Sequence, residues 1–453
     1  MQALTLILGL GESGLAMARW LSRQGHALRV ADSRAQPPGV EDLQTSVPAA
    51  TLHAGPFSDS LLDGVSQVAL SPGLSIDEPL VRKARTLGVP VVGEIELFAQ
   101  ALPTLDKPAK LLAITGTNGK TTTTTLTGEL VRACGLDAAV AGNISPSALT
   151  ELMRRIDGKC LPDVWVLELS SFQLESTASL RPDASTVLNV SDDHLDRHGN
   201  LQTYAGAKTR IFAGDGVQVL NRDDALVHDM ALAGRRVVSF GLDAPAGADY
   251  GVRDGWLARG GEALMAASEL QLAGQHNVAN ALAALALCEA IDLPRAALIR
   301  ALREFRGLPH RVERIARRGD GVEFFDDSKG TNVGATLAAV QGMGRPVVLI
   351  AGGDGKGQDF APLAPALAQH ARALVLIGRD APLIQSAVAG SEVKVLHGSD
   401  MADAVRAASA VAQAGDAVLL SPACASFDMF RNYAHRAQVF CEAVWALPGV
   451  ERA

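Results

Sequence analysis

The chain of 453 residues predicts an α/β protein with three domains, and three observations support this fold class. Short apolar segments alternate with helical segments along most of the chain, which is typical of parallel sheets covered by helices. Two glycine-rich loops, Gly9–Gly14 and Gly116–Thr121, each connect an apolar segment to a helical one. Two proline-bearing linkers, at residues 102–108 and 307–309, interrupt the alternation and divide it into three parts.

The first domain, residues 1–98, is predicted to be Rossmann-like. Its strand-like segments lie at residues 4–8, 27–31, 67–70 and 89–92. The glycine loop follows the first of them, and Asp32 comes 18 residues after Gly14. This spacing is close to the roughly 20 residues that separate a dinucleotide loop from the acidic residue that reaches a ribose. Taken alone, the pattern predicts a nicotinamide cofactor, although the same loop would accept the pyrophosphate of a UDP-linked molecule.

The second domain, residues 99–307, is predicted to be P-loop ATPase-like. An apolar strand leads into Gly116-Thr117-Asn118-Gly119-Lys120-Thr121, and a helix follows. Glycine N–H groups can enclose a phosphate, Lys120 supplies a point charge, and the Thr121 hydroxyl can bind Mg²⁺. Ile114 stands where the full P-loop motif has its first glycine, so a tight turn with a chance lysine is the alternative. Because strand, loop and helix are in register, we predict that the protein uses a nucleoside triphosphate.

Strand and helix signals continue beyond this loop. An antiparallel-looking stretch lies between Val237 and Leu272, and an alanine-rich helix is expected over residues 277–289. The alternation restarts in the third domain, residues 308–453, which is predicted to be Rossmann-like again. The strand-like segments of the two domains lie at residues 164–169, 186–190, 218–220, 322–325, 346–351, 373–377, 393–396 and 417–420.

Composition and charge disfavour several classes of function. The formal net charge is −8 and aromatic residues make up 4% of the chain, so neither a basic surface nor stacking platforms favour nucleic-acid binding. The five cysteines are odd in number and widely spaced, which argues against a disulfide framework or a C-x-x-C metal site. The chain begins with a strand-like segment without a signal-peptide pattern, and no apolar run reaches about 18 residues. We therefore expect a cytoplasmic protein without membrane insertion.

Polar residues near strand ends mark three further candidate sites. Glu168 lies near the C-terminal end of an apolar strand, where open α/β sheets bind ligands, so it could bind Mg²⁺ or be a solvated glutamate. His194 follows the next strand among other ionisable residues and can bind a metal or transfer protons. The loop Gly352–Gly357 contains Lys356 and suits the capture of a carboxylate or phosphate, with a flexible connection as the alternative. Lys208, by contrast, is not distinguished by its surroundings in the sequence.

These motifs resemble those of the Mur ligases over essentially the whole chain. The matching segments are Gly116–Thr121, Glu168–Gln173, Asn189–His194, Gly274–Asn277 with Asn280, Leu308–Arg311, Asp327–Asn332, Gly352–Lys356 and Ser421–Ser426. Within the family, Glu94–Phe98 and Ser421–Ser426 are most similar to the member that adds D-glutamate to UDP-N-acetylmuramoyl-L-alanine. The resemblance implies an ATP-dependent amide ligase of peptidoglycan precursor synthesis that works through an acyl phosphate.

The resemblance also implies roles for individual residues. The catalytic residues would be Lys120, His194 and Lys208. Two Mg²⁺ ions would be held by Thr121, Glu168, His194 and Lys208, the last as an N6-carboxylated lysine. ATP would contact Gly116, Thr117, Asn118, Gly119, Lys120, Thr121, Thr122, Asn277, Asn280, His310, Arg311 and Asp327. The UDP-linked substrate would contact Ser13, Asp32, Ser33, Arg34, Ser71 and Asn143, and D-glutamate would contact Lys329, Thr331, Lys356, Ser426, Phe427 and Tyr433. The N-terminal glycine loop would then hold a uridine pyrophosphate.

Three positions depart from the family pattern: Gly330 replaces an alanine, Ser145 a glycine and Tyr433 a phenylalanine. The expected partners are these small molecules alone, and the protein is expected to be a monomer that closes about linkers near Pro103 and Gly307. A sister ligase, either another Mur ligase or a folate polyglutamate synthetase, would share the ATP site. A nicotinamide-dependent oxidoreductase would use only the N-terminal loop, and a binding module without catalysis is the remaining alternative.

Overall fold

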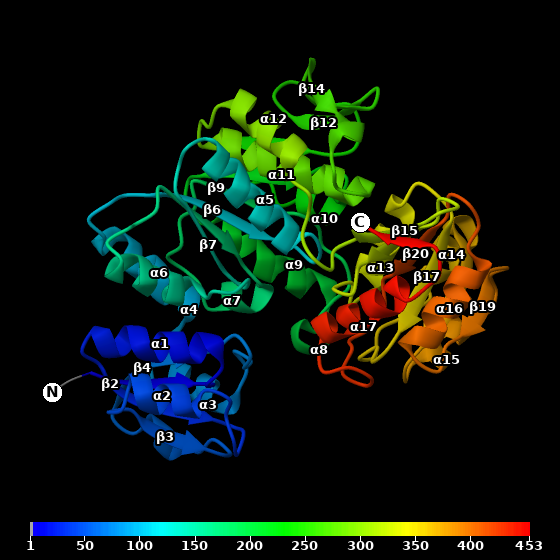
Figure 1. The fold of residues 1–453 in the computed structure, drawn as a ribbon. Coiled ribbons are helices and arrows are strands. Elements are labelled where there is room, and N and C mark those ends of the chain that lie inside the picture. Colours follow the sequence, from blue (N-terminus) through cyan, green and yellow to red (C-terminus); the bar gives the residue numbers. More distant parts are fainter. Residues whose placement is uncertain (1–2) are drawn as a thin grey trace.

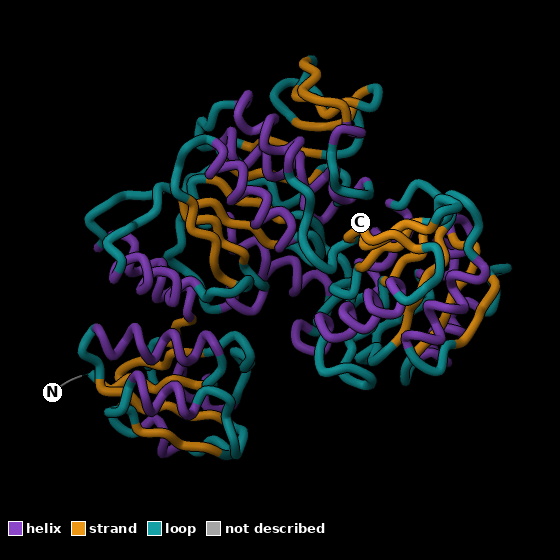
Figure 2. The backbone as a smooth tube through the Cα atoms, viewed as in Figure 1, coloured by secondary structure: helices purple, strands orange, loops and turns teal. Residues whose placement is uncertain are grey.

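The computed structural model describes residues 3–453 and contains three sheets, each in its own part of the chain (Figure 1). Figure 2 shows that helices cover each sheet, so the predicted α/β class with Rossmann-like first and third domains is confirmed. Within the described residues no helix is both long and apolar enough to cross a lipid bilayer.

The N-terminal sheet is parallel and has the order β3-β2-β1-β4-β5. Its strands are β1 (Leu4–Leu8), β2 (Ala27–Asp32), β3 (Thr51–Ala54), β4 (Val65–Leu70) and β5 (Val91–Gly93). Its helices are α1 (Glu12–Arg23), α2 (Val40–Ser46), the 3₁₀ turn η1 (Asp59–Leu62) and α3 (Pro79–Thr86). The sequence missed β3, because this edge strand has no fully buried residue and therefore no apolar run.

The central sheet has nine strands in the order β14-β13-β12-β11-β10-β9-β6-β8-β7, and only β12 to β14 pair antiparallel. The strands are β6 (Lys110–Thr115), β7 (Ala138–Gly142), β8 (Val164–Glu168), β9 (Ala184–Val187), β10 (Val217–Asn221), β11 (Val237–Phe240), β12 (Tyr250–Arg253), β13 (Trp256–Arg259) and β14 (Glu262–Ala266). The sequence missed β7, whose alanine- and glycine-rich composition has low strand propensity.

Helices of the central part cover both faces of this sheet and include the connection from the N-terminal part. They are α4 (Glu94–Ala101), η2 (Leu102–Thr104), α5 (Lys120–Ala133), α6 (Ala148–Asp157), α7 (Ser171–Glu175), α8 (Leu195–His198), α9 (Leu201–Thr209), η3 (Arg210–Phe212), α10 (Ala225–His228), η4 (Ala267–Glu269), α11 (Gln275–Ala290) and α12 (Arg295–Glu304). The boundary placed between residues 98 and 99 falls inside α4, and both domain boundaries stay predictions.

The C-terminal sheet has the order β19-β18-β17-β20-β16-β15-β21, with β15 antiparallel to both neighbours. Its strands are β15 (Glu313–Arg318), β16 (Glu323–Asp326), β17 (Val347–Gly352), β18 (Ala371–Ile377), β19 (Lys394–His397), β20 (Ala417–Leu420) and β21 (Val450–Arg452). Its helices are α13 (Val333–Gly342), α14 (Leu363–His370), α15 (Ala381–Val388), α16 (Met401–Val411) and α17 (Tyr433–Trp445). Strand β15 and the edge strand β21 carry several charged residues, and the sequence predicted neither.

One apolar core runs through the N-terminal and central parts without interruption. It includes Ile7 from β1, Leu21 from α1, Phe98 from α4, and Trp165 from the central sheet. Phe98 and Trp165 are buried and pack edge to face, with their ring centroids 5.0 Å apart. The C-terminal part instead has two core clusters of its own buried residues, one on each face of its sheet.

Candidate active site

The phosphate loop lies between β6 and α5, and its shape depends on glycine. Gly116 and Gly119 have φ of 155° and 80°, a region that side-chain-bearing residues rarely adopt. A Cβ atom on Gly119 would lie 2.4 Å from Asn280 Oδ1, so the loop also needs glycine for space. Asn189 holds the loop from the next strand end, because its Oδ1 accepts the Asn118 N–H at 2.8 Å and its Nδ2 donates to the Asn118 carbonyl.

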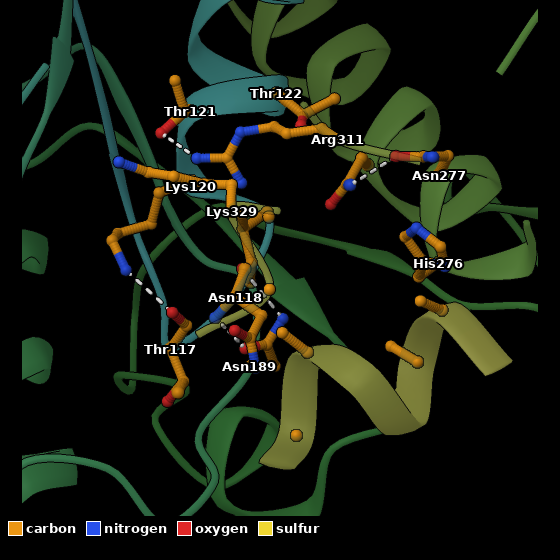
Figure 3. A pocket seen from close by; sticks show the side chains of 18 of the residues that line it. Thr117, Asn118, Lys120, Thr121, Thr122, Asn189, His276, Asn277, Arg311 and Lys329 are labelled. Atoms are coloured by element: carbon orange, nitrogen blue, oxygen red, sulfur yellow. Dashed lines mark hydrogen bonds between the residues drawn. The ribbon is translucent and has the colours of Figure 1, made fainter. Parts of the chain in front are cut away.

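Two lysines donate to the same carbonyl of this loop. Lys120 Nζ donates to the carbonyls of Gly116 and Thr117 at 2.9 and 2.8 Å, and Lys208 Nζ donates to Gly116 O at 2.9 Å (Figure 3 shows Lys120). Burial lowers the pKa of both ammonium groups, and that of Lys208 falls well below its ordinary value because Lys120 adds a second positive charge nearby. Lys208 is 1% exposed and lies 4.3 Å from the centroid of the Tyr204 ring. Burial first, and the nearby charge of Lys120 second, therefore disfavour the charged form of the Lys208 amine.

Glu168 ends β8 beside the loop, and one of its oxygens has no partner. Its Oε1 accepts a hydrogen bond from Asn143 Nδ2 at 2.7 Å, whereas Oε2 is buried without a hydrogen bond to any described residue. An unpaired carboxylate oxygen in a buried position is costly unless a cation or a donor completes it. Glu168 and the Thr121 hydroxyl both line the same cavity, and oxygen donors of this kind fit Mg²⁺.

His194 stands apart from this carboxylate. It has φ of 53° and begins α8, and its half-exposed ring lies 4.8 Å from the ring of Phe172. The neighbouring Asp193, not His194, lines the cavity. Arg197, at the other end of α8, donates to Pro72 O of the N-terminal part at 2.7 Å and to Glu175 at 2.8 Å. The segment that carries His194 is thus fixed from two sides.

A cavity of about 950 Å³ opens between the central and C-terminal parts. Its walls include sixteen of the residues that the sequence assigned to ligands: Thr117, Asn118, Gly119, Lys120, Thr121, Thr122, Asn143, Glu168, Asn277, Asn280, His310, Arg311, Asp327, Lys329, Thr331 and Tyr433. The assigned residues that lie outside these walls are Gly116, His194, Lys208, Ser13, Asp32, Ser33, Arg34, Ser71, Lys356, Ser426 and Phe427. Residues from the phosphate loop and from the C-terminal part thus face one space.

One end of the cavity is lined by α11. Asn280 Nδ2 donates to Asn277 Oδ1 at 3.1 Å, and both residues are buried (Figure 3). His276 also lines the cavity, although the sequence gave it no role of its own. Its Nδ1 is buried without a described hydrogen-bond partner, and burial lowers the pKa of its imidazole to about 4. The ring is therefore neutral at neutral pH and presents an acceptor near Asn277.

The C-terminal part contributes charged groups to the opposite wall. Arg311 Nη2 donates to Thr121 Oγ1 at 2.7 Å, which connects the two parts directly (Figure 3). Asp327 is buried, and its burial raises the pKa of the carboxyl to about 7 although Ser421 Oγ donates to it at 2.6 Å. Lys329 Nζ lies 3.8 Å from the centroid of the Tyr433 ring.

Residues that the sequence did not predict stabilise the C-terminal wall of the cavity. Arg436 is fully buried in α17 and donates to the carbonyls of Ser328 and Cys424 at 2.9 and 3.0 Å. The loops before Lys356 and Ser426 pair with each other, because Asp354 and Ala425 exchange backbone hydrogen bonds. Ser426 is buried, whereas Phe427 is 70% exposed. No sequence signal identified Arg436, since its partners lie up to 108 residues away.

The three departures from the family pattern have local explanations. A Cβ on Gly330 would lie 2.5 Å from Asp327 Oδ2 and 2.8 Å from Ser421 Oγ, so alanine does not fit this arrangement. The Ser145 hydroxyl donates to Glu12 Oε1 at 3.0 Å across the junction with the N-terminal part. Tyr433 packs its ring against Lys329, as a phenylalanine ring would.

The N-terminal loop forms a second, separate site. A Cβ on Gly14 would lie 1.9 Å from Gly9 O, so glycine is required where the loop meets α1. Asp32 Oδ2 accepts the Leu10 N–H at 2.7 Å and pairs with Arg34, and these contacts lower the pKa of its carboxyl to about 2. Ser13 Oγ donates to Glu94 at 2.8 Å. Asp32 thus fixes the loop with both oxygens engaged.

Three family models match the chain in succession. They are a MurD-like N-terminal domain over residues 3–93, a Mur ligase middle domain over 114–288, and a Mur ligase glutamate ligase domain over 310–424. This chain belongs to the Mur ligase family. A UDP-N-acetylmuramoylalanine–D-glutamate ligase of Aromatoleum aromaticum is 58% identical, with 99% of each chain covered. The protein of the same name from Nitrosomonas europaea is 52% identical, covering 97% of this chain and 95% of that relative.

Solved structures of Mur ligases and a related ligase share the fold. The UDP-N-acetylmuramate-alanine ligase MurC of Thermotoga maritima superposes with a TM-score of 0.58 at 19% identity, covering 98% of this Mur ligase and 99% of that chain. FolC of E. coli in complex with ADP gives a TM-score of 0.56 at 20% identity, covering 81% and 98%. At these identities the likeness concerns the fold alone.

Proposed function

We propose that this Mur ligase joins the amino group of D-glutamate to the L-alanyl carboxylate of UDP-N-acetylmuramoyl-L-alanine, with ATP converted to ADP and phosphate, in peptidoglycan precursor synthesis. Relatives that are 52% to 58% identical over nearly the whole chain carry the name of this activity. The single structural observation that carries the proposal is the shared cavity. It brings the phosphate loop together with Lys329, Thr331 and Tyr433, the residues assigned to D-glutamate.

The chemistry requires an activated carboxylate, because hydroxide is a poor leaving group. The substrate carboxylate attacks the γ-phosphorus of ATP, an acyl phosphate forms, and ADP leaves. The D-glutamate amine then attacks the carbonyl carbon, and the C–O bond to phosphate breaks. Lys120 and Arg311 supply positive charge beside the transferring phosphoryl group, so most of the catalysis is positioning and electrostatic stabilisation.

The proposal includes two Mg²⁺ ions. Thr121 Oγ1 and the unpaired Glu168 Oε2 would hold one ion, and His194 with a carboxylated Lys208 would hold the other. Bound there, the ions would neutralise repulsion between the carboxylate and the phosphates. The low pKa of Lys208 supports carboxylation, because only an uncharged amine can react with CO₂.

The remaining assignments follow from the same function. The N-terminal loop, with Ser13, Asp32, Ser33, Arg34, Ser71 and Asn143, would bind the UDP-linked substrate. Lys356, Ser426 and Phe427 would complete the D-glutamate pocket. We further propose a cytoplasmic monomer whose partners are small molecules and not nucleic acid.

Phosphate release from ATP tests the function and separates it from a sister ligase. With UDP-N-acetylmuramoyl-L-alanine present, D-glutamate should stimulate release, whereas L-glutamate and L-lysine should not. Stimulation by another amino acid, or by a folate substrate alone, would assign a different ligase activity. NADH binding to the N-terminal loop would contradict the proposal.

A further inference from the structure

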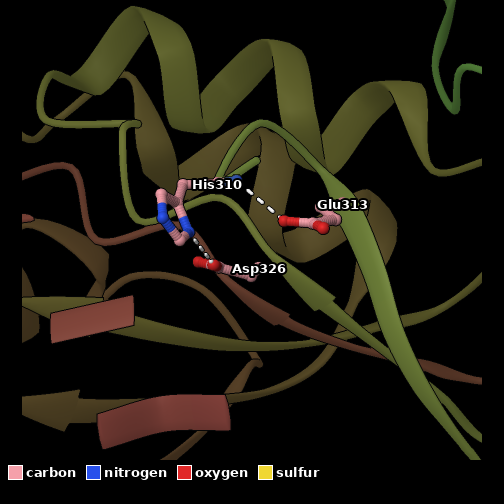
Figure 4. A group of neighbouring side chains, drawn as sticks. All are labelled: His310, Glu313 and Asp326. Atoms are coloured by element: carbon pink, nitrogen blue, oxygen red, sulfur yellow. Dashed lines mark hydrogen bonds and ion pairs between the residues drawn. The ribbon is translucent and has the colours of Figure 1, made fainter. Parts of the chain in front are cut away.

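A partly buried His310 pairs with the fully buried Asp326 at the edge of the cavity (Figure 4). His310 Nδ1 lies 2.6 Å from Asp326 Oδ2, and Asp326, at the end of β16, is fully buried. The Ser328 N–H donates to the other carboxylate oxygen, Oδ1, at 2.9 Å. Glu313 accepts the backbone N–H of His310 at 3.0 Å, which fixes the main chain at a residue whose φ is 64°. The imidazole is therefore held at both its ring and its backbone.

The three groups could suggest a metal site, but their atoms are already engaged. Both Asp326 oxygens accept hydrogen bonds, and His310 Nδ1 is bound to one of them. Among the described residues Nε2 has no hydrogen-bond partner, and His310 lines the cavity. This arrangement leaves one ring nitrogen available to a ligand. It is the arrangement of a histidine whose tautomer and basicity are set by a carboxylate.

His310 lies between residues assigned to the ATP phosphates and residues assigned to D-glutamate. The next residue, Arg311, donates to Thr121 of the phosphate loop. On the other side, the Lys329 N–H donates to His310 O at 3.2 Å, and the centroids of the His310 and Tyr433 rings are 6.2 Å apart. Lys329 and Tyr433 are the residues assigned to D-glutamate, so the imidazole stands between the phosphates and the incoming amino acid.

The second half of the reaction needs a proton acceptor at this place. D-Glutamate arrives with an ammonium group, which has no lone pair and cannot attack a carbonyl carbon. Lys329 and Arg311 also face the cavity here, but ammonium and guanidinium groups offer only donors, whereas the carboxyl of Asp327 is engaged by Ser421 Oγ. The sequence assigned His310 to ATP, and that role would not need a buried carboxylate behind the ring.

We propose that His310 Nε2 accepts the proton of the D-glutamate ammonium, and that Asp326 is the positioning residue that holds its ring. The proposal rests on the proposed function. In the step, the N–H bond breaks and Nε2 gains the proton. The freed nitrogen lone pair forms the C–N bond to the acyl phosphate carbon, and the carbonyl π pair moves onto oxygen to give a tetrahedral intermediate. The C=O bond then re-forms as the C–O bond to phosphate breaks with its electron pair on the leaving phosphate, which takes up the second proton from nitrogen.

The charges around His310 define its pH dependence. Asp326 on β16 and Glu313 on β15 favour the imidazolium, whereas partial burial and Lys329 disfavour it, and the net result is a raised pKa. Because the neutral imidazole is the acceptor, turnover should increase as pH rises through this raised pKa.

The test uses His310→Asn, since asparagine tolerates a positive φ, and Asp326→Asn, with Glu313→Gln as the control that leaves the ring pair intact. Two readouts are needed for the full-length protein. The first is positional isotope exchange in ATP with UDP-N-acetylmuramoyl-L-alanine and no D-glutamate, which reports acyl phosphate formation. The second is kcat/KM for D-glutamate measured from pH 6 to about pH 9.5, a range that brackets the usual pKa of histidine.

We expect both asparagine variants to keep the isotope exchange and to lose kcat/KM for D-glutamate, by about 100-fold or more at pH 7 for His310→Asn. Above the pKa of His310, where the wild type no longer gains from rising pH, this defect should shrink by roughly tenfold per pH unit as more D-glutamate becomes a free amine. A defect that is constant with pH, or an equal loss of isotope exchange, would overturn the proposal and return His310 to a structural or nucleotide-binding role. If Asp326→Asn fails to fold, His310→Asn alone decides. If the wild type forms no product with D-glutamate, the proposed function fails instead.

Discussion

The two junctions between the three parts of this molecule are built differently. At the first junction, apolar side chains of both parts belong to one core, and Phe98 packs on Trp165. Three carboxylates of the N-terminal part, from Glu12, Glu94 and Glu96, accept backbone N–H groups of the central part at Ser147, Leu149, Ala178 and Ser179. At the second junction, two side-chain hydrogen bonds, Arg311 to Thr121 and Asn332 to Asn118, border the 950 Å³ cavity.

The first junction therefore contributes mainly to stability, and the second contains the residues assigned to catalysis. Buried apolar contacts and satisfied helix N-termini make the first junction a permanent interface. The second junction consists of polar walls around a space, and its two hydrogen bonds can open at little cost in water. Substrate-dependent closure is therefore expected at the second junction near Gly307, and not at the linker near Pro103.

Lys120→Ala gives the largest expected effect and concerns the second junction alone. Turnover should fall by about 1,000-fold or more, because the charge beside the transferring phosphoryl group is lost. The melting temperature should stay near that of the wild type, since Lys120 bonds only to carbonyls of its own loop. Phosphate release and thermal denaturation measure the two quantities, and Lys107→Ala, an exposed lysine of the same domain, is the control. Comparable turnover at saturating ATP would remove Lys120 from the chemistry.

Lys208→Ala tests a buried residue of the central part that is proposed to bind Mg²⁺ near the second junction. Turnover should fall by about 100-fold or more, because a metal ligand is lost. Acetate or another small carboxylate should restore part of it by supplying an oxygen ligand in the vacated space. Lys208→Arg should not respond, because the guanidinium fills that space and keeps its charge. An alanine variant that is fully active without added carboxylate would disprove the carboxylated lysine.

Phe98→Ala addresses the first junction. Removing a fully buried ring from the shared core should lower the free energy of unfolding by about 3–5 kcal/mol. The affinity for ATP should be unchanged below the new melting temperature, since the phosphate loop does not touch α4. Chemical denaturation and calorimetric titration give these values, and Leu87→Ala, at a side chain that is 61% exposed, serves as the surface control. A loss of ATP affinity without a loss of stability would mean that the junctions are not independent.

Glu94→Gln should give the smallest effect, visible as a change with pH. Burial raises the pKa of Glu94 above its ordinary 4.5, so the folded state holds its proton more tightly than the unfolded state does. The contribution of this group to stability is complete below that value and is lost as pH rises through the raised pKa. The difference in unfolding free energy between wild type and Glu94→Gln should therefore decrease with rising pH. A difference that does not vary with pH would show that Glu94 is not shifted.

Local patterns carried most of what the sequence could predict. The phosphate loop was found because strand, glycines, Lys120 and Thr121 are consecutive, and the sheets were found because their central strands are apolar. Strands β3 and β21 were missed because edge strands expose polar residues, β15 because it is rich in charged residues although it is paired on both sides, and β7 because it is mostly alanine and glycine. Lys208 was identified as a ligand only through the family resemblance, whereas His194 was already a candidate ligand because it follows a strand end among ionisable residues, and the metal-binding roles of both stay predictions.

The missed residues of the site act through contacts between distant segments. Asp326 meets His310 from another strand, and Arg436 reaches Ser328 across 108 residues of sequence. His276 stands out because its buried Nδ1 has no hydrogen-bond partner among the described residues. Whether a side-chain atom finds a partner depends on the tertiary packing around it. Neither hydrophobic periodicity nor motif spacing predicts such contacts between distant segments.

The uninterrupted core at the first junction also has a consequence for how the molecule unfolds. Three sheets suggest three cooperative units, but the N-terminal sheet cannot separate without exposing Phe98, Trp165 and the apolar face of α1 to water. The two cores of the C-terminal part consist of its own buried residues, and Ala273 of the central part packs against the edge of one of them. Residues 3 to about 307 should therefore melt as one unit and the remainder as another, so that excising the C-terminal part leaves two soluble pieces whereas cutting near residue 102 leaves none.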